Sequence, residues 1–165
     1  MNRLILLRHA KAEAEAASGD DFDRPLAARG RREAQAVAEH LAGLGLRPDV
    51  AVVSPALRTR ETWEALNAVM PGGEIRFERA LYNAEAGAIR RLAEKAGETA
   101  DTVVVIGHNP GLQELTVRLL IEAGGPQTFL SRASRSFPPA AAAVFDIGED
   151  GRAAADGLFY PERQA

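Results

Sequence analysis

Cysteine is absent from the 165-residue sequence. Its absence excludes disulfides, thiolate zinc sites and a cysteine nucleophile, including the mechanisms of the cysteine-based phosphatases. The chain must therefore be stable without covalent cross-links.

A basic excess is also lacking. The formal net charge is −3 and the isoelectric point is near 5.7, whereas nucleic-acid-binding proteins normally carry a basic balance. We therefore expect no nucleic-acid partner, although this composition is compatible with a local basic pocket.

The apolar run at residues 4–7 is far too short to span a membrane. Arg8 and His9 interrupt it where the apolar core of a signal peptide would have to continue. We therefore expect a cytoplasmic protein with no membrane partner.

Histidine is scarce, with three residues at positions 9, 40 and 108. Three scattered histidines without cysteine do not form a set of metal ligands, so we expect no metal and no cofactor. His40 lies on the polar side of a predicted helix, where a solvated histidine without a function is the expectation.

Short apolar segments alternate with amphipathic ones along the chain. Buried strands are predicted at 4–7, 50–53 and 102–107, and a short strand at 75–77. Helices are predicted at 29–44, 55–70, 86–96 and 110–123, with a loop at 124–139 and a terminal hairpin at 140–147 and 153–159. This order predicts one α/β domain over residues 1–165, with helices on both faces of a mostly parallel sheet. The hairpin must contribute at least one antiparallel strand.

Polar residues follow three of these strands: Arg8-His9, Ser54-Pro55 with Arg58, and His108-Asn109-Pro110. Ligands bind at the carboxyl ends of strands in open α/β sheets. Serine and asparagine before proline also predict helix starts at 54–55 and 109–110, whose backbone N–H groups attract anions. Two arginines and two histidines would then surround a tetrahedral dianion, for which phosphate is the natural candidate.

A histidine in such a pocket can be a phosphate ligand or a nucleophile. Attack on phosphorus requires a neutral ring, which neighbouring positive charge favours. His9 could thus become phosphohistidine transiently, while the arginines and His108 stabilise charge on the phosphoryl oxygens.

Three segments, residues 7–11, 54–62 and 105–111, resemble the signature segments of the histidine phosphatase superfamily. The resemblance covers residues 4–120 and is strongest to the short bacterial branch, the SixA-type phosphohistidine phosphatases. It implies a phosphoglycerate mutase-like three-layer α/β/α sandwich, with His9 as nucleophile and Arg8, Arg58 and His108 around the phosphate. We expect Asn109 to contribute to phosphate binding as well.

The general acid is less clearly marked in the sequence. Asp21 matches the position of a loop carboxylate in the short branch, and Glu85 follows the strand at 75–77. Between Met70 and Asp101 there is room for one strand and one helix, so no lid or cap insertion is expected. Near the pocket, Glu61 is expected either to be a surface residue or to hold a pocket cation in place. Arg132 and Arg135, in the predicted loop, are expected either to steer an acidic partner or to be solvated.

Three functions are compatible with this pattern. The first is a metal-independent phosphatase that removes phosphate from phosphohistidine in a protein, such as a phosphotransfer domain, through phospho-His9. The second is a phosphomonoesterase that acts on a small phosphate ester, and the third is a non-catalytic phosphoprotein-binding module. We expect a monomer.

Overall fold

A computed structural model describes residues 1–161 of the chain. Its centre is a six-stranded sheet in the order β3-β2-β4-β1-β5-β6. β1, β2, β3 and β4 are parallel, whereas β5 runs antiparallel to both β1 and β6. The strands are β1 (Arg3–Arg8), β2 (Val50–Val53), β3 (Glu74–Phe77), β4 (Thr102–Gly107), β5 (Ala142–Ile147) and β6 (Ala153–Phe159).

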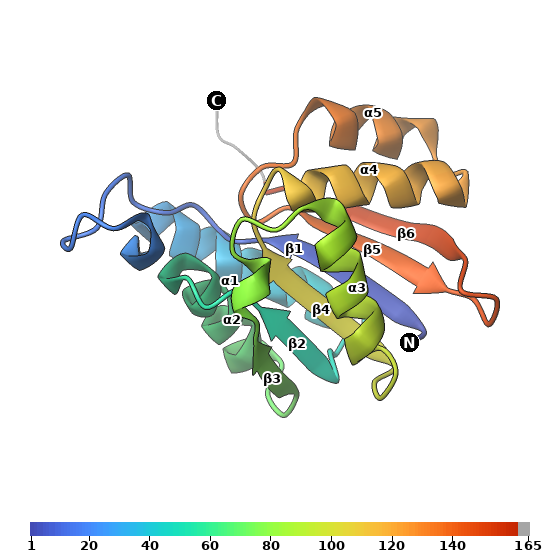
Figure 1. The fold of residues 1–165 in the computed structure, drawn as a ribbon, viewed down its shortest axis with the longest axis horizontal. Helices are drawn as coiled ribbons and strands as arrows, with labels where there is room; N and C mark the ends of the chain where they lie inside the picture. The colour runs from blue at the N-terminus through green and yellow to red at the C-terminus, as the bar shows by residue number, and fades with distance from the viewer. Residues whose placement is uncertain (162–165) are drawn as a thin grey trace.

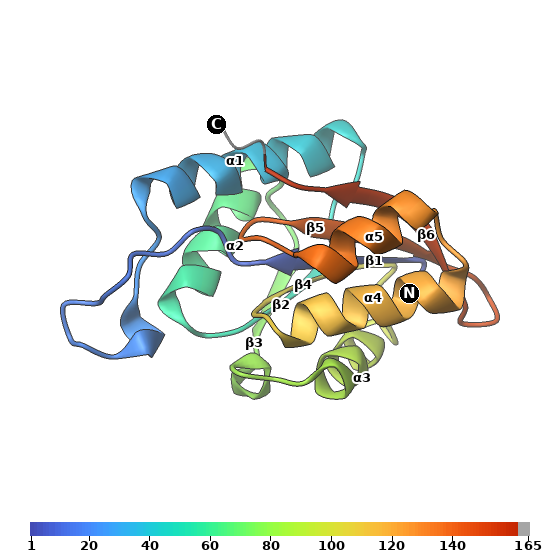
Figure 2. The same cartoon turned by 90° about the horizontal axis from the view of Figure 1, so that it is seen from above.

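Helices cover both faces of this sheet, which confirms the predicted α/β fold (Figures 1 and 2). One layer holds α1 (Ala28–Gly43) and α2 (Leu57–Val69). The other holds α3 (Ala86–Ala96), α4 (Gly111–Ala123) and α5 (Gln127–Arg135). Two short 3₁₀ helices, η1 (Asp21–Asp23) and η2 (Arg79–Leu81), lie in the connections after β1 and β3.

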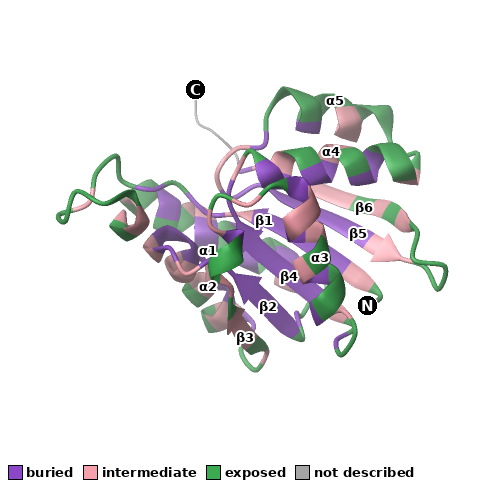
Figure 3. Ribbon diagram, in the orientation of Figure 1, coloured by how far each residue is buried: buried purple, intermediate pink, exposed green. Residues whose placement is uncertain are grey.

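The central strands are buried on both faces (Figure 3). In β1, Leu4 and Leu6 pack toward α3 and α4, while Ile5 and Leu7 pack toward α1 and α2. A strand that buries both faces has no polar positions, which explains why β1 and β4 read as continuous apolar runs.

The register of β1, β2 and β4 places the polar residues that follow these strands next to one another at the same edge of the sheet. Arg8 pairs with Gly107 across β1 and β4, and Val53 pairs with Ile106 across β2 and β4. His9, Ser54 and His108 are the next residues in each chain segment, so they leave the sheet together. The long connection that carries η1 extends from this same end of the sheet (Figure 1).

The predicted loop at 124–139 is wrong, because residues 127–135 form α5. Pro126 occupies the position before the helix, where its missing N–H costs no helical hydrogen bond. Phe129, Leu130 and Ala133 then pack against the main core from one side of α5. Arg132 and Arg135 therefore lie in the last turn of a helix.

The predicted helix starts at 54–55 and 109–110 are also wrong. α2 begins at Leu57 after Ala56, and α4 begins at Gly111 after Pro110. The side chains of Ser54 and Asn109 do not cap these helices. The hydroxyl of Ser54 lies against His108. Nδ2 of Asn109 donates to the carbonyl of Phe137, and its Oδ1 has no hydrogen-bond donor among residues 1–161. No helix within residues 1–161 is long and apolar enough to cross a membrane.

Candidate active site

His9 follows the last residue of β1, and its side chain is buried. Its backbone N–H donates to the carbonyl of Gly107 at 3.1 Å, which fixes the residue against β4. Ring atom Nδ1 lies 2.8 Å from the carbonyl oxygen of Ala10. Because a carbonyl only accepts, Nδ1 carries the proton, and the lone pair is on Nε2.

Burial lowers the pKa of His9 from 6.5 to about 3, and the electrostatic influence of His108, Arg8 and Arg58 acts in the same direction. The ring is therefore neutral at physiological pH. A neutral imidazole with its lone pair on Nε2 is the form required for nucleophilic attack.

His108 follows β4, and its ring centre lies 5.3 Å from that of His9. Nε2 is 2.8 Å from Oγ of Ser54, and Nδ1 is 3.4 Å from a terminal nitrogen of Arg58. Burial, and then the charge of Arg58, lower the pKa of His108 to about 4. This ring is neutral at physiological pH as well.

Arg58 lies in the first turn of α2 and is buried. Its two terminal nitrogens donate to Asp21, one to the carbonyl at 2.8 Å and one to Oδ2 at 3.1 Å. Among residues 1–161, its Nε has no hydrogen-bond acceptor. Thr62 accepts from the N–H of Ala10 at 3.0 Å and donates to the carbonyl of Arg58 at 2.8 Å, so it joins the segment after β1 to the first turn of α2.

Arg8 and Asn109 share one hydrogen-bond acceptor on the backbone. Nη1 of Arg8 and Nδ2 of Asn109 donate to the carbonyl of Phe137, at 3.0 and 2.8 Å. They also line a groove of about 550 Å³ that runs past Arg135 at the end of α5. Both residues thus lie beside this groove, and the positive charge of Arg8 also acts on His9 and His108.

Asp21 reaches the pocket from η1. Its carboxylate accepts from the hydroxyl of Tyr82 at 2.6 Å, from Arg58 at 3.1 Å and from Nε of Arg24 at 2.9 Å. These donors, Tyr82 first, lower the pKa of Asp21 to about 2. The carboxyl is therefore ionised and holds Arg58 in place.

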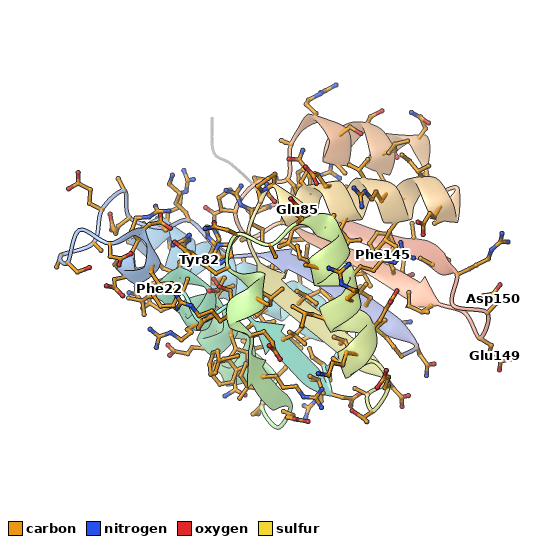
Figure 4. All side chains as sticks on the ribbon, in the orientation of Figure 1. Phe22, Tyr82, Glu85, Phe145, Glu149 and Asp150 are labelled. Atoms are coloured by element: carbon orange, nitrogen blue, oxygen red, sulfur yellow. The ribbon has the colours of Figure 1, made fainter. Side chains whose placement is uncertain are left out.

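Glu85 is the residue before α3 and is exposed. Its carboxylate receives no hydrogen bond or ion pair from the part of the chain that the structure describes. Figure 4 shows it at the start of α3, on the same side of the molecule as Tyr82. The structure therefore places Asp21 within the network around Arg58 and His108, and leaves Glu85 outside this network.

Glu61 does not hold a pocket cation. It accepts from the backbone N–H of Leu26 at 2.8 Å and pairs with Arg31 at 3.1 Å. Its position on α2 faces the end of the η1 connection, so it fixes that connection to α2.

Two residues acquire roles that sequence reasoning missed. Tyr82 follows η2, its hydroxyl binds Asp21, and its ring packs edge-on against His108 and Phe22 at 5.5 and 5.2 Å between centres. Phe22 and Tyr82 lie side by side in Figure 4. Ser54 is a partner of His108 and not a helix cap. A polar residue directly after a buried strand was a signal for Ser54, whereas Tyr82 follows a short edge strand and carried no such signal.

Cationic Arg8 and Arg58 with two neutral histidines form an electropositive pocket that suits a phosphoryl group. Within residues 1–161, no group of three or more histidine, aspartate or glutamate side chains is arranged to hold a metal ion.

Comparison with known proteins extends this picture. The family model of the histidine phosphatase superfamily (branch 1) matches residues 4–135. An uncharacterised chloroplastic protein of Arabidopsis thaliana is 33% identical over 68% of this chain, although the match spans only 56% of that relative. An uncharacterised protein of Mycobacterium tuberculosis is 32% identical over 94% of this chain and 99% of its own length.

A solved structure from Agrobacterium tumefaciens, assigned as a phosphohistidine phosphatase SixA, matches with a TM-score of 0.81. Its sequence is 30% identical, and the match covers 97% of this chain and 98% of that one. These matches support a phosphatase. The chain belongs to the histidine phosphatase superfamily.

Proposed function

We propose that this chain removes phosphate from phosphohistidine in a protein, through a covalent phospho-His9 intermediate. The observation that carries the proposal is the state of His9, a neutral ring whose Nδ1 is held by the carbonyl of Ala10 and whose Nε2 has the free lone pair. Similarity to the Agrobacterium tumefaciens structure supports the choice of substrate.

The reaction proceeds in two displacements. The lone pair of His9 Nε2 attacks phosphorus, and the bond between phosphorus and the substrate nitrogen breaks as that nitrogen takes up a proton. Water then attacks the phosphoryl group on His9, which releases inorganic phosphate and regenerates the neutral ring. Arg8, Arg58, His108 and Asn109 bind the phosphoryl oxygens in both steps.

The proton for the leaving imidazole comes from Asp21, Glu85 or water. In the free site Asp21 is ionised, because Tyr82, Arg58 and Arg24 all bind its carboxylate. A phosphoryl group that draws Arg58 away from Asp21 would raise the pKa of the Asp21 carboxyl. That carboxyl would then be a better proton donor.

The shortness of the connection between β3 and β4 also supports a protein substrate. That connection contains only η2 and α3, and we propose that no lid closes over the site. A phosphotransfer domain or a similar phosphorylated protein could then reach His9. We further propose that the protein acts as a monomer in the cytoplasm, without metal or cofactor.

The decisive experiment uses the wild-type chain and His9→Ala with a phosphorylated phosphotransfer domain. We expect His9→Ala to lose turnover and to retain part of its affinity for inorganic phosphate. Wild type should trap a phosphoryl label that is labile in acid and stable in alkali, and the variant should not. Full activity of His9→Ala would refute the mechanism.

Action on a small phosphate ester is the second candidate, because the groove of about 550 Å³ beside Arg8 and Asn109 could hold the rest of such a substrate. An ester needs a positioned acid, so Asp21→Asn or Glu85→Gln should then impair ester hydrolysis strongly. Ranking phosphoproteins, sugar phosphates and nucleotides by kcat/KM with one preparation distinguishes the two. Phosphate release from any phosphohistidine peptide would exclude the third candidate, a non-catalytic binding module.

A further inference from the structure

Ser54 is fully buried at the end of β2, and its backbone is fixed on both sides. Its N–H donates to the carbonyl of Ile106 at 3.1 Å, and its carbonyl accepts from Oγ1 of Thr59 at 2.7 Å. The hydroxyl therefore has a defined position, 2.8 Å from Nε2 of His108.

The hydrogen bonds of the Ser54 hydroxyl limit how its single hydrogen can be used. Oγ accepts from the backbone N–H of Ala56 at 3.4 Å. Within residues 1–161, the only acceptor within hydrogen-bonding distance of Oγ is Nε2 of His108. If Nε2 carried the ring proton, a buried hydroxyl hydrogen would have no acceptor, which is costly in a protein interior.

A neutral histidine ring has one N–H group. Whether that N–H is on Nδ1 or on Nε2 decides whether His108 can donate a hydrogen bond to a phosphoryl oxygen. Nδ1 faces the pocket, because it lies 3.4 Å from a terminal nitrogen of Arg58. A guanidinium only donates, so a proton on Nδ1 gains an acceptor when an oxygen of a bound group lies against both nitrogens. With the proton on Nε2, Nδ1 would present a lone pair to the phosphoryl oxygens and repel them. With the proton on Nδ1, the ring donates to those oxygens.

We propose that Ser54 is a positioning residue that donates its hydroxyl hydrogen to Nε2 of His108 and thereby holds the ring proton on Nδ1, directed at the phosphoryl group. An oxygen of the bound group then lies between Nδ1 of His108 and Arg58 and accepts from both. No net proton transfer is required, since the ring stays neutral and only its tautomer is selected. The inference rests on the proposed function in that phosphate occupies this pocket.

The first test is spectroscopic and requires no variant. The chain labelled with ¹⁵N-histidine is titrated with inorganic phosphate, and the ¹⁵N shifts of His108 report which nitrogen carries hydrogen. We expect the Nδ1–H tautomer in the phosphate complex. An Nε2–H tautomer in that complex, or no effect of phosphate on the His108 signals, would overturn the inference.

The second test replaces the hydroxyl. Ser54→Ala should lower kcat by about 10- to 100-fold, because the ring loses its orientation as a donor to the phosphoryl group. The same variant should show His108 wholly or partly as the Nε2–H tautomer. Wild-type kcat together with an unchanged Nδ1–H tautomer in Ser54→Ala would refute the role of Ser54.

A matched control removes another fully buried hydroxyl. Thr116 on α4 donates to the carbonyl of Leu112 at 2.8 Å, and within residues 1–161 its hydroxyl has no hydrogen bond to His9 or His108. Thr116→Val should leave the His108 tautomer and kcat unchanged. Ser54→Thr keeps a hydroxyl at this position and should keep the Nδ1–H tautomer of His108. Turnover of phosphohistidine is measured separately: its absence in wild type refutes the proposed substrate, whereas the phosphate-bound tautomer decides the role of Ser54.

Discussion

Both terminal nitrogens of Arg58 donate hydrogen bonds to Asp21, one to its carbonyl oxygen at 2.8 Å and one to its carboxylate at 3.1 Å. A guanidinium expected to bind phosphate thus also binds a carboxylate. Asp21 belongs to η1 and Arg58 to α2, so this contact also holds the long connection after β1 against the pocket.

Asp21→Asn should strengthen the binding of inorganic phosphate. The variant removes a negative charge that competes with phosphate for Arg58, and an exposed charge of this kind changes affinity by about two- to fivefold. Competitive inhibition by inorganic phosphate measures the effect. Asp23→Asn, also in η1 and hydrogen-bonded to Ser18, is the control, and weaker phosphate binding by Asp21→Asn would contradict this prediction.

Tyr82→Phe should raise the pKa of Asp21. The hydroxyl of Tyr82 is the largest of the causes that hold this pKa at about 2, because a hydrogen bond to the ionised carboxylate stabilises that form. A ¹³C NMR titration of the Asp21 carboxyl measures the change. Tyr160→Phe is the control, since Tyr160 donates to the carbonyl of Ser136. An unchanged titration in Tyr82→Phe would show that the other donors suffice.

The free energy of unfolding should fall as the pH is lowered from 7 to 5. The pKa values of His9 and His108 are about 3 and about 4 in the folded chain, against 6.5 for an unperturbed histidine. The unfolded chain therefore binds protons at these rings in a range where the folded chain does not. Each ring can contribute up to about 2 kcal/mol to this loss between pH 7 and 5.

Urea unfolding at pH 7, 6 and 5 checks this linkage. His9→Asn and His108→Asn should each reduce the pH dependence, and the double variant should reduce it further. His40 is exposed on α1, and His40→Asn controls for the number of histidines. Equal pH dependence in wild type and the double variant would contradict the low pKa values.

Gly30→Ala should destabilise the fold and disturb the site. A Cβ at Gly30 would lie 2.0 Å from the carbonyl oxygen of Lys11, in the connection that leads from His9. Relief of such an overlap must move backbone, at a cost of about 1–3 kcal/mol. Gly43 lies in the same helix, and apart from its chain neighbours and the backbone of its own helix no atom of residues 1–161 lies within 4 Å of its Cβ position.

Gly43→Ala is the matched control and should be neutral or raise the free energy of unfolding by up to about 1 kcal/mol. Thermal unfolding and kcat of both variants test the pair. A stability of Gly30→Ala equal to that of Gly43→Ala would show that the connection after β1 yields without cost.

The fold was largely predictable because its strands and helices have strong local patterns. The continuous apolar runs of β1, β2 and β4 correspond to burial on two faces, and α1, α3 and α4 carry clear apolar stripes. α5 was missed because it is short. The few apolar residues on its one buried side are recognisable only once their packing against the core is known. The helix start at Ser54 was misplaced because its hydroxyl has a tertiary hydrogen-bond partner in His108, which the local capping preference does not reveal. The start at Asn109 was misplaced by two residues, since α4 begins at Gly111 after Pro110.

The sequence by itself determined that Arg8, His9, Arg58, His108 and Asn109 stand at the carboxyl ends of strands or in the helices that follow, since this depends on chain order and strand pattern. The tertiary structure alone decided their partners. It placed the carbonyl of Ala10 against Nδ1 of His9, Ser54 against Nε2 of His108 and Tyr82 against Asp21. Which nitrogen carries a proton and which carboxylate is ionised depend on burial and on contacts between distant residues, and no local pattern encodes these.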